Sequence, residues 1–188
     1  MRNGNTLLNL TSPGEGIGDI RINGGVQWRK AKKPGDPNIT LRSSLSLPTG
    51  DSKKLLGSGG MDAAFWVSAD RAVSWFDSPG GLWGGAGILL LGEGDVLADQ
   101  QRDIVMFGSI GGGAKVWSGV SLKLQIDVHT ALYNKSSLNQ INSNAVQLIM
   151  GGDIELDKNI KLDLAVKEDP TVYSSPDVVF YLGLAIEK

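Results

Sequence analysis

The sequence predicts an all-β protein, an antiparallel up-and-down transmembrane β-barrel of about ten strands. Two observations predict this fold class: long runs in which every second residue is apolar, and connections that are alternately short and long. Successive side chains of a strand point to opposite faces, so each run has an apolar and a polar face. Soluble strands average about 5–6 residues, whereas a strand that crosses a bilayer needs about 9–11. We expect the 188 residues to form a single domain.

The expected strands follow one another along the whole chain, at residues 4–11, 19–30, 38–49, 61–76, 82–92, 104–116, 120–132, 144–156, 160–168 and 177–187. Short, turn-like connections at 31–37, 77–81, 117–119 and 157–159 alternate with longer polar ones at 51–60, 93–103, 133–143 and 169–176. Outer-membrane barrels have short periplasmic turns and longer external loops. The pattern therefore predicts that both termini lie on the periplasmic side. Within 95–102 we expect one helical turn.

The middle strands, 82–92 and 104–116, differ from the later ones because both of their faces are apolar or glycine. A continuous apolar run fits a strand that is buried on both sides. We therefore expect a packed, partly apolar interior at this stretch of wall. Glycines inside these strands indicate bends or close backbone approaches, which a barrel needs in order to curve.

The late strands alternate most regularly, and their apolar face is predicted to contact lipid. The clearest lipid-facing candidates lie on 120–132 and 177–187: Val120, Leu122, Leu124, Ile126, Val128, Phe180, Leu182 and Leu184. The opposite, polar face is predicted to line the lumen: Lys123, Gln125, Asp127, His129, Asp153, Glu155, Lys161, Asp163 and Lys167. Because a buried charge must be paired or stay hydrated, we expect ion pairs across neighbouring strands, or a polar path for a solute along this wall.

Tryptophans gather beside the short connections. Trp28, Trp75, Trp83 and Trp117 all lie there, with Phe76, whereas Trp66 falls inside a strand. Aromatic residues are enriched at membrane interfaces, so we predict an aromatic girdle at this end of the barrel. The alternative is that these tryptophans belong to the core of a soluble β-protein.

Composition excludes several other classes of protein. The net charge is −2 and the sequence contains no cysteine, so no basic surface for nucleic acid, no disulfide and no Cys-based zinc site is expected. Mean hydropathy is −0.05, and no run of about 20 apolar residues predicts a membrane helix. The first residues lack the basic and apolar regions of an export signal. Our expectation is that a signal has been removed or that the chain is the C-terminal part of a longer barrel.

Candidate chemistry is sparse. His129 follows Asp127 at i+2, but Ser121 on the same strand lies too far away to complete a catalytic triad. The nucleophile of such a triad would have to be a serine of another strand. One histidine cannot form a His-rich metal site, and we expect neither a metal nor a cofactor. Carboxylates gather in the long connections and could bind Ca²⁺, although solvated loop charge is the simpler interpretation: Asp51, Asp62, Glu93, Asp95, Asp99, Asp103, Glu168, Asp169 and Asp177. The glycine strings lack the G-K-[ST] ending of a phosphate loop.

Several segments resemble an uncharacterised bacterial family, a domain of unknown function with a predicted outer-membrane β-barrel. They are GIGDIRI (16–22), SLSLPTGD (44–51), GSGGMDAAFW (57–66), GEGDVLADQQRD (92–103), QIDVHTALY (125–133) and VKEDPTVYSSPDVVFYLGL (166–184). The resemblance implies an envelope barrel and brings no catalytic residues. Members of that family are longer, with more strands before the segment that resembles GIGDIRI. This chain also ends in Glu187-Lys188, whereas outer-membrane proteins commonly end on an aromatic residue.

The sequence thus predicts a porin-like bacterial outer-membrane protein that is not an enzyme. Its expected partners are membrane lipid and a small solute or apolar ligand in the barrel, and its role is structural, solute-binding or that of a narrow channel. The first alternative is a soluble β-barrel or β-sandwich that binds an apolar ligand. The second is an outer-membrane hydrolase that uses His129. The oligomeric state is left open.

Overall fold

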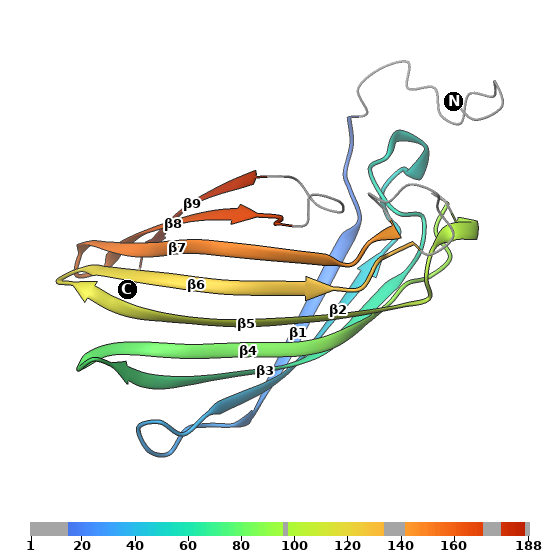
Figure 1. The fold of residues 1–188 in the computed structure, drawn as a ribbon. Coiled ribbons are helices and arrows are strands. Elements are labelled where there is room, and N and C mark those ends of the chain that lie inside the picture. The colour runs from blue at the N-terminus through green and yellow to red at the C-terminus, as the bar shows by residue number, and fades with distance from the viewer. Residues whose placement is uncertain (1–14, 96–97, 134–141, 171–177, 187–188) are drawn as a thin grey trace.

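The computed structural model describes residues 15–95, 98–133, 142–170 and 178–186 (Figure 1). Nine strands make up most of this part of the chain: β1 (Ile20–Arg29), β2 (Asn38–Leu47), β3 (Asp62–Trp75), β4 (Ser78–Leu90), β5 (Ile104–Trp117), β6 (Val120–His129), β7 (Ala145–Asp157), β8 (Ile160–Glu168) and β9 (Val178–Ile186). Two short 3-10 turns, η1 (Ser52–Lys54) and η2 (Ala98–Gln100), lie in long connections, and η2 falls where one helical turn was expected. The strand predicted at 4–11 lies outside the described residues.

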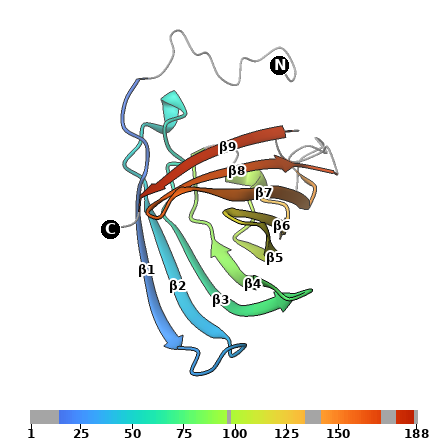
Figure 2. The same cartoon turned by 90° about the vertical axis from the view of Figure 1, so that its left-hand side faces the viewer.

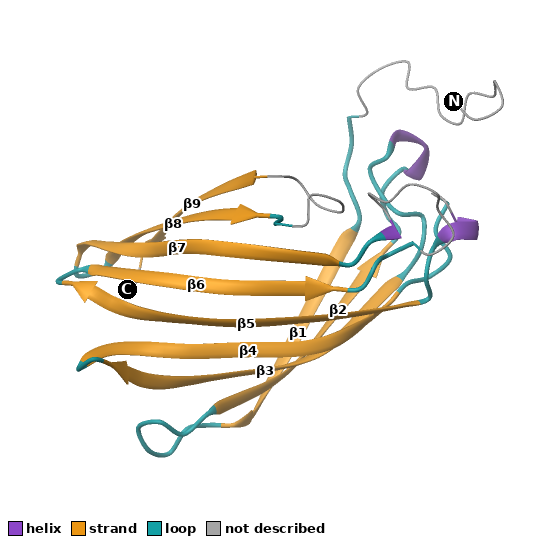
Figure 3. Cartoon of the chain, viewed as in Figure 1, coloured by secondary structure: helices purple, strands orange, loops and turns teal. Residues whose placement is uncertain are grey.

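The nine strands form one antiparallel sheet in which each strand pairs with the next along the chain, in the order β1 to β9 (Figures 1 and 3). The prediction of an all-β, antiparallel, up-and-down arrangement is therefore confirmed. Within the described residues no hydrogen bonds join β1 to β9, so hydrogen bonding does not close the sheet. The strands contain between 9 and 14 residues, longer than the average strand of about 5–6.

Short and long connections alternate as predicted, with one correction. The turn expected at 77–81 is wrong, because β4 already begins at Ser78, which pairs with Trp75. Only Phe76 and Asp77 form the turn, and both have positive φ, 48° and 66°. Two left-handed residues are the mark of a type I′ turn, whose twist matches that of the flanking strands. Pro79, Gly80 and Gly81 are therefore part of the ladder rather than of the turn.

The sheet curls, which gives it a concave and a convex face (Figure 2). Contacts between strands that are not neighbours identify the concave face, because only there do side chains lean toward each other over an intervening strand. Trp66 of β3 meets Phe107 of β5, with ring centroids 6.2 Å apart. Lys123 of β6 reaches Asp163 of β8 at 3.7 Å. Odd-numbered side chains of β6 therefore lie on the concave face and even-numbered ones on the convex face.

No second layer of described residues covers either face of the sheet. Among the described residues the only buried apolar side chains are Val105, Ala131 and Ala145. Val105 lies on the concave face of β5, in the stretch of wall that was expected to be packed on its interior side. On β6 to β8 the charged residues Lys123, Asp153 and Asp163 lie on the concave face and large apolar residues lie on the convex face, the reverse of a sheet folded around an apolar core.

Candidate functional site

The convex face is apolar and exposed over the late strands. Leu122 and Leu124 are 53% and 51% exposed, and Phe180 and Leu182 are 80% and 72% exposed. All eight residues that the sequence predicts to face lipid lie on this face. It carries a hollow of about 940 Å³, where Gly112 and Gly152 have no side chain. Leu122, Met150 and Leu164 are among the residues that line it.

The apolar surface is continuous because the strand register brings apolar residues and glycines together. Leu124 pairs with Gly112 on one side and with Met150 on the other. Val166 pairs with Met150 and with Phe180. Charged side chains on this face, such as Arg71 and Glu168, lie toward the ends of their strands. The middle of the convex face therefore presents hydrocarbon across several strands.

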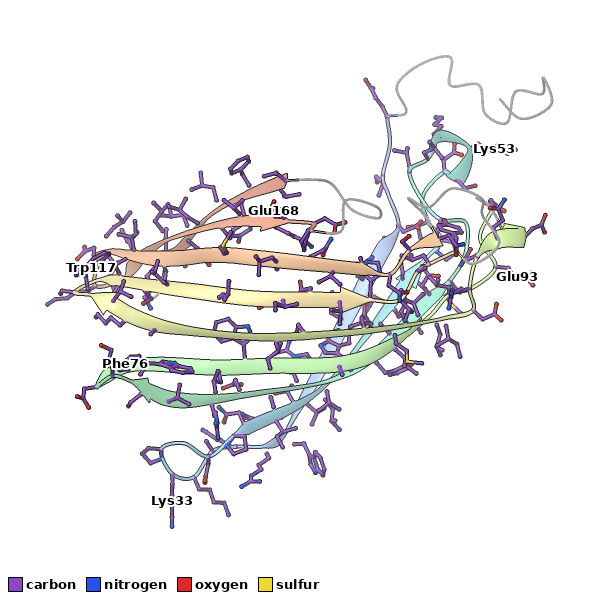
Figure 4. All side chains as sticks on the ribbon, viewed as in Figure 1. Lys33, Lys53, Phe76, Glu93, Trp117 and Glu168 are labelled. Atoms are coloured by element: carbon purple, nitrogen blue, oxygen red, sulfur yellow. The ribbon has the colours of Figure 1, made fainter. Side chains whose placement is uncertain are left out.

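Exposed aromatic side chains mark the end of the sheet that carries the short turns. Phe76 is fully exposed at the β3–β4 turn, and Trp28 and Trp117 are each 71% exposed. Figure 4 shows Phe76 and Trp117 at one end of the strands and Lys53 and Glu93 at the other. Trp75 lies on the convex face of the same end, over Gly80. Trp28, Trp75, Phe76 and Trp117 together form the aromatic end of the sheet. Trp83, which the sequence groups with them, lies instead on the concave face, where it donates a hydrogen bond to Gln125.

Ion pairs cross the strands on the concave face. The Lys123 ammonium pairs with the carboxylates of Asp153 and Asp163, which lie directly opposite each other on β7 and β8. Lys115 pairs with Glu155 at 3.6 Å. Lys161 also lies on this face, opposite Glu155, and it has an interaction partner. Lys167 occupies the same face of β8, opposite Ile149.

A chain of hydrogen bonds orients the polar groups in the middle of the concave face. The Trp83 indole N–H donates to Gln125 Oε1 at 2.6 Å. Gln125 Nε2 then donates to Asp127 Oδ1 at 2.7 Å. The oxygen and the nitrogen of the Gln125 amide are therefore both hydrogen-bonded, and Gln125 links the indole to the Asp127 carboxylate.

These groups line a cavity of about 510 Å³ on the concave face. Aromatic side chains from three strands, Trp66, Trp83 and Phe107, contribute to its wall, together with Arg42, Asp127 and His129. Local periodicity did not single out Trp66, Phe107 or Arg42. The glycines of β4 and β5 are the sequence signal that could have located these rings, because Phe107 lies over Gly87 and Trp83 lies over Gly111.

The His129 ring lies beside the backbone of the next residue. Its Nδ1 lies 2.9 Å from the backbone oxygen of Thr130. Ser109 of β5 lies opposite Asp127, but among the described residues no hydrogen bond joins His129 to Asp127 or to a serine hydroxyl. In the same part of the chain no three His, Asp or Glu side chains gather closely enough to hold a metal ion.

Carboxylates tie together the long connections at the other end of the sheet. Asp19 accepts hydrogen bonds from the backbone N–H groups of Ser58 and Gly50, both at 2.9 Å. These two donors, Ser58 first, hold the pKa of the Asp19 carboxyl below its ordinary value. Asp95 accepts from the Ser52 hydroxyl at 2.6 Å. Asp19 and Asp95 thus accept hydrogen bonds from groups of the protein itself.

Glycines make this close packing possible. A side chain at Gly57 would collide with the Asp19 carboxylate, and one at Gly59, whose φ is +77°, would collide with Asp95. The Gly-Ser-Gly-Gly string of residues 57–60 therefore lets two other segments, the one before β1 and the β4–β5 connection, approach the β2–β3 connection closely. The sequence shows these glycines and aspartates, but it does not show which aspartate packs against which glycine.

Comparison with known proteins gives a family and no activity. The model of a family described as "Protein of unknown function (DUF3187)" matches residues 1–187. A search of curated proteins found no match for the chain. Within the described residues, no helix has the length and apolar character that crossing a membrane requires.

Proposed function

We propose that this chain, which belongs to the DUF3187 family, forms the wall of a β-barrel in a bacterial outer membrane. The description of the family assigns no activity. In this proposal the convex face contacts lipid and the concave face lines a narrow polar lumen. The protein binds or passes a small solute there and is not an enzyme.

One observation carries the proposal: the convex face exposes large apolar side chains over consecutive strands while the concave face holds the charges. A soluble monomer rarely exposes contiguous apolar patches larger than a few hundred Å². Hydrocarbon around the convex face would remove this cost, because each buried CH₂ group contributes about 0.8 kcal/mol. An acyl chain would also fill the hollow beside Gly112 and Gly152.

The aromatic end supports the same orientation. Phe76 and Trp117 lie at the end that carries the short turns, and Trp28, the penultimate residue of β1, is exposed beside the β1–β2 connection. Aromatic rings favour the headgroup region because they combine an apolar body with a polar edge or π-face. In this proposal that end lies at the periplasmic interface, and the long connections tied by Asp19 and Asp95 face the exterior.

The polar face suits a lumen in which charges need partners. Lys123, Asp153 and Asp163 form a paired group there, which lowers the cost of holding charge in a narrow space. We propose that these pairs stiffen the wall, because they link β6, β7 and β8 on the side away from lipid.

A matched pair of substitutions on β6 tests the orientation. Leu124 lies on the convex face and Gln125 beside it lies on the concave face. We expect Leu124→Arg to impair membrane insertion, since an arginine near the midplane costs about 2–4 kcal/mol. Gln125→Arg should be tolerated in insertion. The measurement is the fraction of protein that floats with lipid vesicles in a density gradient. Equal flotation of the two variants would contradict a lipid-facing stripe.

The soluble alternative predicts a different result with the unmodified chain. A soluble sheet that binds an apolar ligand in the hollow of the convex face would remain monodisperse in buffer without detergent. The membrane proposal predicts aggregation when detergent is removed and recovery when it is restored. Size-exclusion chromatography with and without detergent distinguishes the two.

A further inference from the structure

We propose that the cavity of the concave face is a binding site for a neutral sugar, held between aromatic rings and hydrogen-bonded along its rim. The inference rests on the proposed function only for the route by which the sugar arrives, which is the barrel interior. The site itself is formed by side chains of β2 to β7.

Strand register builds the site in rows. One row runs across five strands and contains Arg42, Trp66, Gly87, Phe107 and His129. The next row along the strands is small and hydroxylic at its centre: Ser68, Gly85 and Ser109, with Asp127 beside Ser109. The third row contains Asp70, Trp83, Gly111 and Gln125. A low floor of small residues thus lies between two rows that carry bulky rings.

The rings are held in place by neighbouring groups. Trp66 and Phe107 pack edge to face, with an angle of 64° between their planes. Phe107 reaches over Gly87, where a side chain would collide with it. On the other side of the floor the Trp83 indole lies over Gly111, and its N–H is fixed by Gln125. Because ring position is set by glycine gaps and by a hydrogen bond, the walls are preorganised for a ligand.

Polar groups around the rings offer both donors and acceptors. Arg42 Nε donates to the Ser68 hydroxyl at 3.2 Å. Asp70 accepts from Asn38 Nδ2 at 2.8 Å, and Asp127 accepts from Gln125. Guanidinium, carboxylate and amide groups are planar and can bind two neighbouring hydroxyls at once. The cavity of about 510 Å³ lies within the range of about 300–1,000 Å³ that is typical of small-ligand sites.

A sugar matches this arrangement better than a charged solute. A pyranose ring has faces of C–H groups that stack on aromatic rings and a rim of hydroxyls that need donors and acceptors. Asp70 and Asp127 would repel an anion, and Arg42 would repel a cation. Each of these charged groups is hydrogen-bonded to a neutral group of the protein, and together they carry both signs, so a ligand with a single charge would be repelled by at least one of them.

The test measures sugar binding by isothermal titration calorimetry on the full chain in a detergent without a sugar headgroup. Three probes of one shape separate the effects of charge: glucose, the cation glucosamine and the anion glucuronate. We expect saturable binding of glucose that is at least ten-fold tighter than binding of either charged probe. Trp66→Leu removes a stacking surface and should weaken glucose binding at least ten-fold. The matched control, Trp117→Leu, alters an exposed tryptophan of the turn end and should leave the affinity unchanged.

A second variant keeps the test decisive if Trp66→Leu does not fold. Ser109→Leu fills the floor of the site while it keeps all the rings, and it should abolish binding. No saturable binding of glucose, preferential binding of a charged probe, or glucose binding that survives both variants would overturn the inference. Because binding is measured in micelles and insertion in vesicles, a failure here is distinct from a failure of the membrane proposal.

Discussion

At the scale of single residues, Lys123 pairs two carboxylates that would otherwise face each other on the concave face. Asp153 and Asp163 face each other directly across β7 and β8, and like charges in that position are destabilising. The Lys123 ammonium contacts both carboxylates, so its attraction to each of them offsets the repulsion between them. All three side chains are partly exposed, which keeps the magnitude modest.

We predict that Lys123→Met lowers the free energy of unfolding by about 1 kcal/mol, because it leaves the two carboxylates facing each other without a cation. Adding Asp163→Asn to that variant should recover most of the loss. Urea unfolding in detergent micelles measures both effects as a double-mutant cycle. Additive losses from the two changes would show that the residues are not coupled.

Asp19 makes a second residue-scale prediction, at the opposite end of the sheet. Its pKa is lower in the folded protein than its ordinary value of 3.8 because the N–H groups of Ser58 and Gly50 donate to the carboxylate. A lowered pKa means that the stabilisation is present above pH 3.8 and is lost as the pH falls through the lowered value. As the pH falls through this range, we expect the amide hydrogens of Gly50 and Ser58 to lose protection, so that their exchange rates approach the intrinsic rates at each pH.

Asp19→Asn is the control for this pH dependence. The asparagine cannot ionise, so exchange at Gly50 and Ser58, measured by NMR, should lose its dependence on pH in this range. A profile identical to that of the unchanged chain would show that another group controls the loop.

At the scale of elements, the β3–β4 hairpin combines an unfavourable turn with an exposed ring. Phe76 and Asp77 both adopt positive φ, a region that costs a non-glycine residue about 1–2 kcal/mol. Asparagine followed by glycine would suit this turn better. In the proposed orientation, the fully exposed Phe76 of this turn would contact the membrane interface.

We predict opposite effects on stability and on membrane binding when this turn is replaced. Phe76→Asn with Asp77→Gly should raise the free energy of unfolding in micelles by about 1 kcal/mol or more. The same change should reduce the fraction of protein that binds lipid vesicles, because the exposed ring is lost. Phe76→Trp, which keeps an aromatic ring, should bind as the unchanged chain does. Unaltered vesicle binding by the Asn-Gly variant would remove the hairpin from the proposed interface.

The late strands could be predicted from the sequence and the middle strands only in part. In β6 the two-residue period alone assigns Leu124 and Gln125 to opposite faces. In β4 and β5 the faces depend on pairs such as Trp83 over Gly111, which lie far apart in sequence and leave no local period. This is why Trp83 was grouped with the turn-end aromatics and why the cavity residues Trp66 and Phe107 were not foreseen. The hairpin boundary at Ser78 was missed because Pro79-Gly80-Gly81 has the composition of a turn.

At the scale of the whole molecule, nine antiparallel strands form one curled sheet whose two sides have opposite chemistry (Figure 2). The concave face carries most of the charged residues together with the aromatic rings of the cavity, and the convex face carries exposed aliphatic residues. In a bilayer, unpaired strand edges are costly because no water satisfies their backbone groups. The proposal therefore requires that the edges of β1 and β9 find hydrogen-bond partners once the sheet is in lipid.

The most direct test of the central claim is a cysteine scan along β6 in lipid vesicles. The chain has no cysteine, so each substitution from Ser121 to Val128 places a single fluorescent label. Labels at even positions should be quenched by brominated lipid tails, and labels at odd positions by aqueous iodide, in strict alternation. Iodide quenching of equal strength at all eight positions, with none by brominated lipid, would contradict a wall with one face in the membrane.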